Sequence, residues 1–399
     1  MAERRTISFL SPGIALVTGL ALAISMAPAA QAAPVDREAA SILADAPKGE
    51  PVTVVTTTQT ADGPQFSTEV ADSRGDALDL ISDALDEPAT EVDVAHPVSI
   101  AGTRRSNDTF RPQQWALNKL KAEKNWRKSR GKGVVVAVID TGVRAGHPDL
   151  KGRVKKGWDF IGSDGAASDM NGHGTHVAGA IAANSNNRRG VAGLAPSAKI
   201  LPVRVLDASG NGNTAVVARG IVYAVNKGAD VINLSLAGER PDAQTRAAVA
   251  YAIRKNVVVV AAAGNRGCGA PTTYPAAYPN VIGVGAIDRY NRVAPYSQCG
   301  SYVDVVAPGS SIASTMIYRS DPAFGCGYGT SYCRLSGTSM ATPYASASAA
   351  LLISRTKGKM RASKVRRLMT AKASNIGPRG RDAASGHGVV NPWRMMAGR

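Results

Sequence analysis

The chain has 399 residues, a length that suits one large globular domain together with a smaller one. Hydrophobic residues make up 44% of the sequence and charged residues 19%, which excludes a largely disordered protein. Aromatic residues make up only 5%, which argues against a protein that stacks single-stranded nucleic acid on aromatic side chains. The basic residues are dispersed without a dense arm, so we expect no nucleic-acid partner.

The formal net charge of +17 is unevenly distributed along the chain. Residues 34–100 contain 14 acidic and 3 basic residues, whereas residues 101–399 contain 15 acidic and 42 basic residues. Opposite charge on two parts of one chain suggests that an acidic leader docks on a basic domain. The polar, basic junction at Arg104 and Arg105 is the expected exposed boundary between them.

The first 32 residues have the pattern of a secretory signal peptide. A short basic end precedes an apolar run, and Ala30-Gln31-Ala32 supplies the small residues of a cleavage site. A membrane anchor is the alternative, but the run is shorter than the ~20 residues that a spanning helix needs. No later segment could span a bilayer, so we expect a secreted, extracellular protein.

All four cysteines lie late in the chain, at Cys268, Cys299, Cys326 and Cys333. An even number of cysteines in an exported chain predicts two disulfides. Three pairings are possible, and the short gap favours Cys326 with Cys333, which leaves Cys268 with Cys299. A metal site is the alternative, but it lacks CxxC spacing and a nearby histidine.

Residues 33–105 predict one small α+β unit. The hydrophobic pattern indicates a strand over 51–59, an amphipathic helix over 76–87 and a second strand over 90–100. Such a unit is small for a domain that must be stable by itself.

From about residue 107 the pattern changes to apolar strands that alternate with helices. Near-continuous β-branched runs of this kind are typical of strands buried on both faces of a parallel sheet. They cover residues 134–140, 198–207, 230–236, 256–264 and 280–288. We therefore predict an α/β fold over residues 106–399, with a mostly parallel central sheet and helices on both faces. Functional groups of such folds gather beyond the carboxyl ends of the strands.

An aspartate, a histidine and a serine lie at the predicted ends of strands and starts of helices, where functional groups of such folds gather. Asp140 ends the first strand in VIDTGV, His173 begins a helix in NGHGTHVAG, and Ser339 opens a helix in SGTSMATP. A serine hydroxyl becomes a nucleophile when an imidazole takes its proton and a carboxylate orients that imidazole. Asn265 follows a buried strand in AAAGN, where its amide could donate to an oxyanion beside the backbone N–H of Ser339. Singly, these residues would fit turns and helix caps, but together they indicate nucleophilic catalysis.

In this combination and in the order Asp, His, Ser, the motifs resemble the subtilisin-like serine proteases (peptidase family S8), especially the thermitase-like secreted members. The resemblance covers about residues 107–399. It implies a serine endopeptidase that works through an acyl-enzyme, with catalytic Asp140, His173 and Ser339 and with Asn265 in the oxyanion hole. The alternatives are a dedicated processing protease for one exported partner and a degenerate protease that acts as a binding protein.

The resemblance also implies where substrate binds. An extended peptide would pair with two backbone segments, Gly210-Asn211-Gly212 and Ser235-Leu236-Ala237, which predicts broad cleavage of protein and peptide substrates. The family usually has glycine in place of Ala237, so one pocket wall is expected to be slightly narrower. The family usually has histidine in place of Tyr344, for which we expect a packing change without loss of catalysis. The first specificity pocket would include Ala262, Ala263, Gly264, Arg266 and Thr273.

Arg266 stands where it could face the residue before the scissile bond. We predict that it disfavours lysine and arginine there and tolerates acidic side chains. The alternative is a solvated arginine without influence on specificity.

A structural calcium site is a further implication, since calcium prefers carboxylate, amide and carbonyl oxygens. Its side-chain ligands would be Asp108, Asp149 and Asn187, completed by the carbonyls of Asn184, Arg189 and Val191. The alternative is a cap and two turn residues. A second site would use Asp159 and Asp164, with Asp169 compensating for ligands replaced or weakened at Gly162, Ala166 and Ser168.

Residues 33–105 have the length of the propeptide that secreted members of this family carry, although their sequence matches it only weakly. Another protease could cut at Arg104-Arg105, or the enzyme could cut itself within 95–107. We expect a monomer whose partners are its substrates and its own propeptide.

Overall fold

A computed structural model describes residues 35–44, 46, 51–61, 63–87, 90–95, 105–319, 326, 330–358 and 360–397. The chain divides into two compact units, residues 1–102 and 103–399. The expected signal peptide at 1–32 and Arg104 of the basic junction lie outside the described residues. In the part that is described, no helix is long and apolar enough to cross a membrane.

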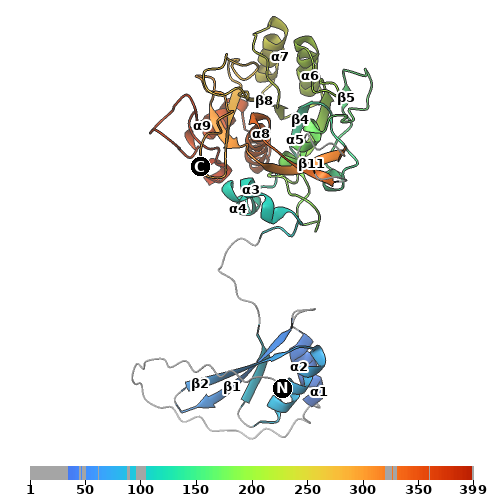
Figure 1. The fold of residues 1–399 in the computed structure, drawn as a ribbon, viewed down its shortest axis with the longest axis vertical. Coiled ribbons are helices and arrows are strands. Elements are labelled where there is room, and N and C mark those ends of the chain that lie inside the picture. Colours follow the sequence, from blue (N-terminus) through green and yellow to red (C-terminus); the bar gives the residue numbers. More distant parts are fainter. Residues whose placement is uncertain are drawn as a thin grey trace. The chain divides into compact units, whose positions relative to one another are not determined.

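The first unit is a three-stranded antiparallel sheet with two helices (Figure 1). Its strand order is β2-β1-β3, and its core contains Leu43, Val54 and Ile81. The elements are α1 (Val35–Ala44), β1 (Val52–Thr60), β2 (Gly63–Ala71), α2 (Arg74–Leu85) and β3 (Thr90–Val94).

The sequence pattern missed α1 and β2 in this unit. Along β2 only Ala71 is buried, so the strand lacks the alternation of apolar and polar residues that marks a half-buried strand. β3 ends at Val94, and residues 96–100 of the predicted strand lie outside the described part.

The second unit is built on a seven-stranded sheet in which all neighbouring strands are parallel. The five predicted strands form its middle, and two short strands that the pattern missed extend its edges. The spatial order is β10 (Val305–Pro308), β9 (Ile282–Ile287), β8 (Val258–Ala262), β7 (Val231–Leu234), β4 (Val135–Asp140), β6 (Lys199–Arg204) and β5 (Trp158–Asp159).

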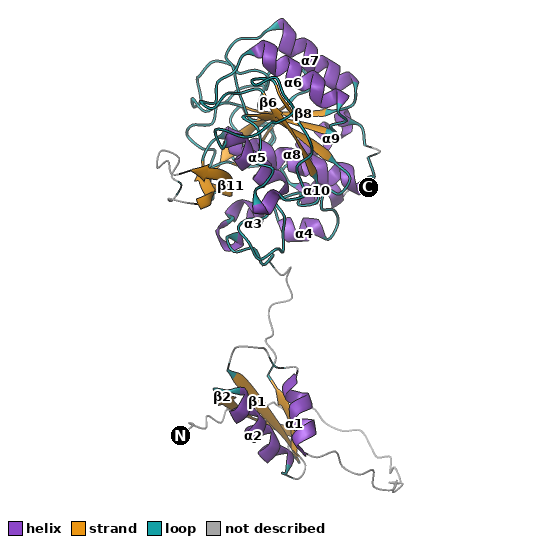
Figure 2. Ribbon diagram, turned by 90° about the vertical axis from the view of Figure 1, so that its right-hand side faces the viewer, coloured by secondary structure: helices purple, strands orange, loops and turns teal. Residues whose placement is uncertain are grey.

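Helices cover both faces of this sheet (Figure 2), which confirms the predicted fold class. Val136 and Val138 of β4 point into a core shared with helices α5 (His173–Ala182) and α8 (Thr338–Arg355). Ala137 and Ile139 point the other way, into a core shared with helices α6 (Thr214–Asn226) and α7 (Ala243–Arg254). The remaining helical elements are η1 (Arg111–Gln113), α3 (Trp115–Lys119), α4 (Ala122–Trp126), η2 (Pro148–Leu150), α9 (Ala362–Ala371) and α10 (Pro392–Ala397).

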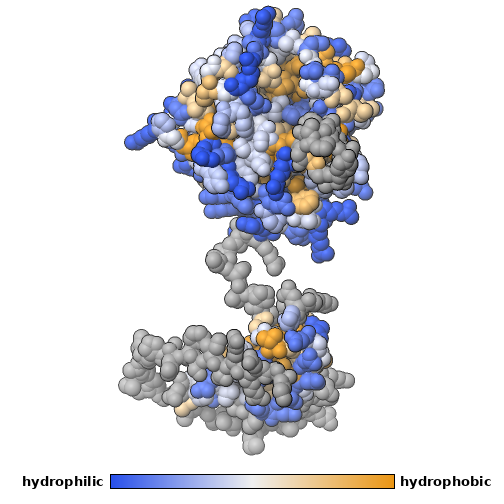
Figure 3. Space-filling view, viewed as in Figure 1, coloured by the Kyte–Doolittle hydropathy of each residue, from blue (hydrophilic) through white to orange (hydrophobic). Residues whose placement is uncertain are grey.

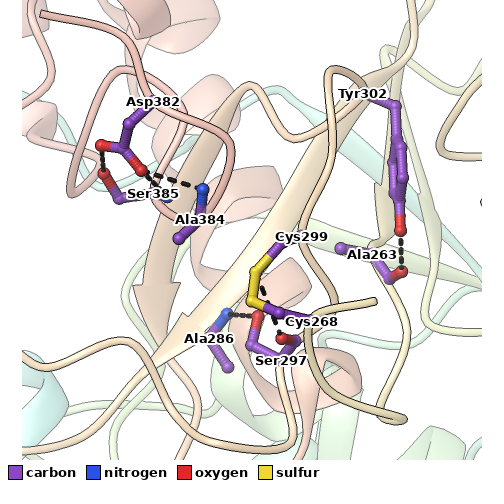
Figure 4. The surroundings of a disulfide bond; sticks show 9 residues. All are labelled: Ala263, Cys268, Ala286, Ser297, Cys299, Tyr302, Asp382, Ala384 and Ser385. Carbon is purple, nitrogen blue, oxygen red and sulfur yellow. Dashed lines mark hydrogen bonds between the residues drawn. A yellow bond between two sulfur atoms is a disulfide. The ribbon is translucent and has the colours of Figure 1, made fainter. Parts of the chain in front are cut away.

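Polar side chains cover most of the visible face of this unit, with apolar side chains in small patches between them (Figure 3). A hairpin of β11 (Ile312–Arg319) and β12 (Thr330–Leu335) lies beside α5. Both disulfides that the cysteine spacing favoured are present, Cys326–Cys333 and Cys268–Cys299. The latter lies close to Ser297, whose hydroxyl accepts a hydrogen bond from Ala286 of β9 (Figure 4).

Candidate active site

Asp140 and His173 are in direct contact at the carboxyl edge of the sheet. The Nδ1 atom of His173 lies 2.7 Å from Oδ1 of Asp140. The same carboxylate oxygen accepts the N–H of Thr141 at 2.8 Å, and the side chain of Asp140 is fully buried. Because Nδ1 donates to the carboxylate, Nε2 of the neutral ring is left as the proton acceptor.

Electrostatics favour the protonated form of His173. Burial alone would lower the pKa of this imidazole, but the charge of Asp140, its hydrogen bond and the charge of Asp169 outweigh burial. The pKa of His173 is therefore raised above its usual value of 6.5. The ring is 23% exposed and lines a pocket at this edge, so it can meet a substrate.

Asp169 holds the segment that carries His173, a role that the sequence did not reveal. Its Oδ1 accepts the N–H groups of Asn171 and Gly172 and the hydroxyl of Thr141. Its Oδ2 accepts both the N–H and the hydroxyl of Thr175 in the first turn of α5. One buried carboxylate thus links the end of β4 to the start of α5, and it is not available as a metal ligand.

Ser339 lies in the first turn of α8. Its hydroxyl donates to the carbonyl of Ser235 at 3.0 Å, and no hydrogen bond joins it to His173 in the described structure. The structure therefore brings Asp140 and His173 into contact, but the hydroxyl of Ser339 is hydrogen-bonded to Ser235 and not to His173. Rotation about the Cα–Cβ bond of Ser339 would release this contact, as is common for catalytic hydrogen bonds without substrate.

A buried hydrogen-bond chain fixes the backbone of Ser339. The hydroxyl of Ser346 donates to Oδ1 of Asn233 at 2.8 Å, and Nδ2 of Asn233 donates to Oγ of Ser235 at 3.0 Å. Ser235 in turn donates to the carbonyl of Ser339 at 2.8 Å. Asn233 and Ser346 are fully buried, so α8 is tied to β7 beneath the serine.

Asn265 is oriented by its contacts with Thr338. Its side-chain oxygen accepts the N–H of Thr338 at 2.8 Å and the hydroxyl of the same residue at 2.9 Å. This arrangement assigns the oxygen to Thr338 and leaves the Nδ2 end as a donor. Asn265 and Ser339 line the same small pocket, as an oxyanion donor and a nucleophile must.

The nine predicted substrate-binding residues line two pockets that share Leu236 and Ala237. The larger pocket has a volume of about 470 Å³ and contains His173. The smaller has a volume of about 260 Å³ and contains Ser339. The larger pocket is lined by Gly210, Asn211, Gly212, Ser235, Leu236 and Ala237. The smaller pocket, which is the predicted first specificity pocket, is lined by Gly264, Arg266 and Thr273.

Other expectations for the pocket are met unevenly. Ala262 lines the smaller pocket, but Ala263 is fully buried, and its carbonyl accepts the hydroxyl of Thr273. Gln298 and Glu239, which the sequence did not single out, also line this pocket. Tyr344 is 1% exposed and packs in the core between α8 and the sheet, away from both pockets.

The residues of the predicted calcium site are also brought together. Asp108 accepts the N–H groups of Asn186 and Asn187, each at 3.1 Å. Asp149 accepts the side-chain amide of Asn187 at 2.7 Å and the N–H of Val191 at 2.8 Å. Burial raises the pKa of Asp149 although hydrogen bonds from Asn187, Val191 and Tyr332 oppose it.

This donor set fits a calcium ion. Neither Asp108 nor Asp149 has an ion-pair partner among the described residues, and both are at least 98% buried. Three nearby backbone carbonyl oxygens accept no hydrogen bond within the described structure, those of Asn184, Arg189 and Val191. No three His, Cys, Asp or Glu side chains among the described residues are placed to hold a metal ion together, so amide and carbonyl oxygens would supply the remaining ligands.

The second predicted calcium site does not fit a metal ion. Asp159 forms an ion pair with Arg204 at 2.9 Å, and its other oxygen accepts the N–H groups of Ile161 and Gly162. Asp164 accepts the N–H of Ala166, and Asp169 is engaged beside His173. The guanidinium of Arg204 therefore supplies the positive charge that a cation would bring.

A parallel sheet with an Asp–His pair and a serine at its carboxyl edge defines the class of α/β serine hydrolases. Residues 131–388 match the Subtilase family (Peptidase_S8), and the chain belongs to this family. It is a serine endopeptidase, and its substrates are peptides or proteins.

The chain is similar to several named proteases. It is 46% identical to Thermitase of Thermoactinomyces vulgaris over 288 residues, 72% of this chain and 97% of that protein. It is 44% identical to Subtilisin Savinase of Lederbergia lenta over 239 residues, 60% of this chain and 83% of that one. Among solved structures, a protease of Pseudoalteromonas arctica matches with a TM-score of 0.67 and 31% identity, covering 74% of this chain and 99% of that chain.

Proposed function

We propose that this protein is a secreted endopeptidase in which Ser339, His173 and Asp140 form the catalytic triad. The observation that carries the proposal is the 2.7 Å contact between His173 and the buried Asp140 at the pocket edge. It fixes the tautomer in which Nε2 can take a proton from a serine hydroxyl.

In this mechanism Ser339 turns from the Ser235 carbonyl toward His173 and attacks the substrate carbonyl carbon, while Nε2 of His173 takes its proton. Asp140 stabilises the imidazolium, and Nδ2 of Asn265 together with the backbone N–H of Ser339 holds the developing oxyanion. His173 then protonates the leaving amine. Water, deprotonated by His173, releases the acyl group and restores Ser339.

We further propose that residues 1–32 direct secretion and that residues 33–105 are an acidic propeptide, removed to give a mature protein from about residue 106. The division of the chain near residue 102 and the opposite charges of the two parts support this organisation. The mature enzyme would be a monomer.

One structural calcium ion would be held by Asp108, Asp149 and Asn187 with the carbonyls of Asn184, Arg189 and Val191. Its support is a pair of buried carboxylates that form no direct ion pair in the described structure, beside carbonyls without donors there. When bound, the ion would tie the start of the mature chain to the loop after α5.

Cleavage should be broad, because a substrate that pairs with the backbone of 210–212 and 235–237 is held independently of its sequence. Ala237 would narrow one wall of the first pocket slightly. By itself Arg266 would disfavour lysine or arginine before the scissile bond, but it forms an ion pair with Glu239 at the same pocket.

The test is the intact mass of the secreted protein after treatment with a fluorophosphonate, beside the variant Ser339→Ala. We expect one adduct on a chain that starts near residue 106, and none on the variant. A folded mature chain without an adduct would overturn the proposal in favour of a binding protein. An adduct combined with a narrow cleavage profile would point to a dedicated processing protease.

A further inference from the structure

Glu239 and Arg266 form an ion pair at the smaller pocket. The two side chains come from different segments: Glu239 lies two residues after Ala237, and Arg266 directly follows Asn265. They are 46% and 61% exposed, so the pair lies at the mouth of the pocket and remains accessible to a substrate.

The rest of this pocket carries no charge among its described lining residues. Its other side chains are apolar, amide or hydroxyl groups, and a substrate side chain inside it would meet formal charges only at Glu239 and Arg266. This pair therefore determines how the pocket responds to a charged substrate side chain.

The ion pair changes what Arg266 can do. A lone arginine would repel a basic side chain and attract an acidic one. With Glu239 in contact, the opposite charges nearly cancel at the distance of a substrate side chain, and the guanidinium must leave its partner before it can bind a carboxylate.

We propose that Glu239 is a specificity-determining residue that neutralises Arg266 at the first pocket, so that the enzyme favours uncharged side chains before the scissile bond. A substrate lysine can form an ion pair with Glu239 only by displacing Arg266. A substrate glutamate can form one with Arg266 only by displacing Glu239. Uncharged side chains leave the pair intact. This inference rests on the proposed catalytic role of Ser339.

The experiment compares kcat/KM for three peptides that differ only before the scissile bond, with leucine, lysine or glutamate there. In the wild-type enzyme we expect leucine to be preferred and the other two to be similar. Glu239→Gln should raise the glutamate-to-lysine ratio by up to about fivefold, the upper range for exposed charge pairs, and Arg266→Gln should lower it by a similar factor.

The surface pair of Asp288 and Arg292, in which Arg292 is exposed and Asp288 half-buried, supplies controls, because it has the same chemistry and lines neither pocket. Asp288→Asn and Arg292→Gln should leave the ratio unchanged. At ~1 M salt, where the screening length falls to about 3 Å, the effects of Glu239→Gln and Arg266→Gln should shrink.

A ratio that stays within twofold after Glu239→Gln, or that moves in the same direction for both pocket variants, would overturn the inference. A wild-type enzyme that cleaves none of the three peptides and takes no fluorophosphonate adduct would instead count against the proposed function.

Discussion

Thr338 holds the side-chain oxygen of Asn265 with two hydrogen bonds, from its N–H at 2.8 Å and from its hydroxyl at 2.9 Å. The same hydroxyl accepts the N–H of Gly264 at 3.1 Å. Thr338, which precedes the candidate nucleophile Ser339, therefore orients the candidate oxyanion donor Asn265. The first turn of α8 positions both the nucleophile and the donor.

Replacing Thr338 by valine should reduce kcat while KM changes little. The variant keeps the shape of the side chain but loses the hydroxyl that donates to Asn265 and accepts the N–H of Gly264. Loss of the bond to Asn265 is worth about 1 kcal/mol, or roughly fivefold in rate. Asn265→Ala should cost about 10²- to 10³-fold, the magnitude known for such a donor in a subtilisin and taken over from that relative. Equal rises in KM for both variants would contradict this role in the transition state.

The pH profile of kcat/KM should report His173. Its pKa is raised, and the ring must be neutral to accept a proton, so activity should fall as the pH drops through a midpoint above 6.5. Asp140→Asn removes the charge and should move the midpoint down while it lowers kcat by about 10⁴-fold, as in other triads. A wild-type midpoint below 6.5 would be inconsistent with this electrostatic arrangement.

The buried ring of His176 should make the protein less stable in acid. Burial and the nearby charge of His173 lower the pKa of His176 to about 4, whereas the unfolded value is near 6.5. The unfolded chain therefore binds the proton first, and the contribution of His176 is complete above pH 6.5 and is lost as the pH falls toward 4. The expected loss is up to about 3 kcal/mol of unfolding free energy.

Denaturant unfolding of the fluorophosphonate-inhibited protein at pH 7.5, 5.5 and 4.5 would measure this loss. His176 donates from Nε2 toward the carbonyls of Ile312 and Cys333, and glutamine can donate similarly without titrating. His176→Gln should therefore show a shallower decline with acid. If variant and wild type decline with the same slope, His176 is not the titrating group.

Calcium should stabilise the inhibited protein, and a chelator should remove that stabilisation. Binding to the folded state alone adds about 4 kcal/mol at 1,000 times Kd. Asp149→Asn should abolish the calcium-dependent rise in Tm, whereas Asp164→Asn, outside the proposed site, should retain it. A similar rise in Tm in Asp149→Asn and wild type would place the ion elsewhere.

The buried ion pair of Arg111 and Glu123 should matter far more for stability than an exposed one. Arg111 is fully buried and binds Glu123 through two hydrogen bonds, at 2.7 and 2.9 Å. Glu123→Gln leaves the guanidinium without its counter-charge and should cost about 3–5 kcal/mol of unfolding free energy. The control Arg292→Gln, which breaks an ion pair at an exposed arginine, should cost less than about 1 kcal/mol. Equal losses of unfolding free energy in Glu123→Gln and in the control would show that burial does not determine the contribution of the Arg111–Glu123 pair.

The sequence predicts those strands and helices whose burial requires a recognisable pattern of apolar residues. Strands such as β4 and β8 are buried on both faces and appear as continuous β-branched runs. β2 exposes nearly all its side chains and β5 has two residues, so neither leaves a recognisable hydrophobic period.

The site shows a similar division. Asp140 and His173 lie in local motifs at strand and helix ends, and their contact follows from the parallel topology. The bonds of Asp169, the rotamer of Ser339 and the pairing of Arg204 with Asp159 depend on three-dimensional neighbours, which one sequence does not specify.

The five hydrogen bonds accepted by Asp169 have a consequence for the reaction itself. Asp140 and His173 are 33 residues apart, yet the segments that carry them are anchored to the same carboxylate. Their relative position is therefore set when the protein folds, before any substrate arrives. Proton transfer then requires little rearrangement of the acid–base pair, and substrate binding has mainly to align the scissile carbonyl with Ser339.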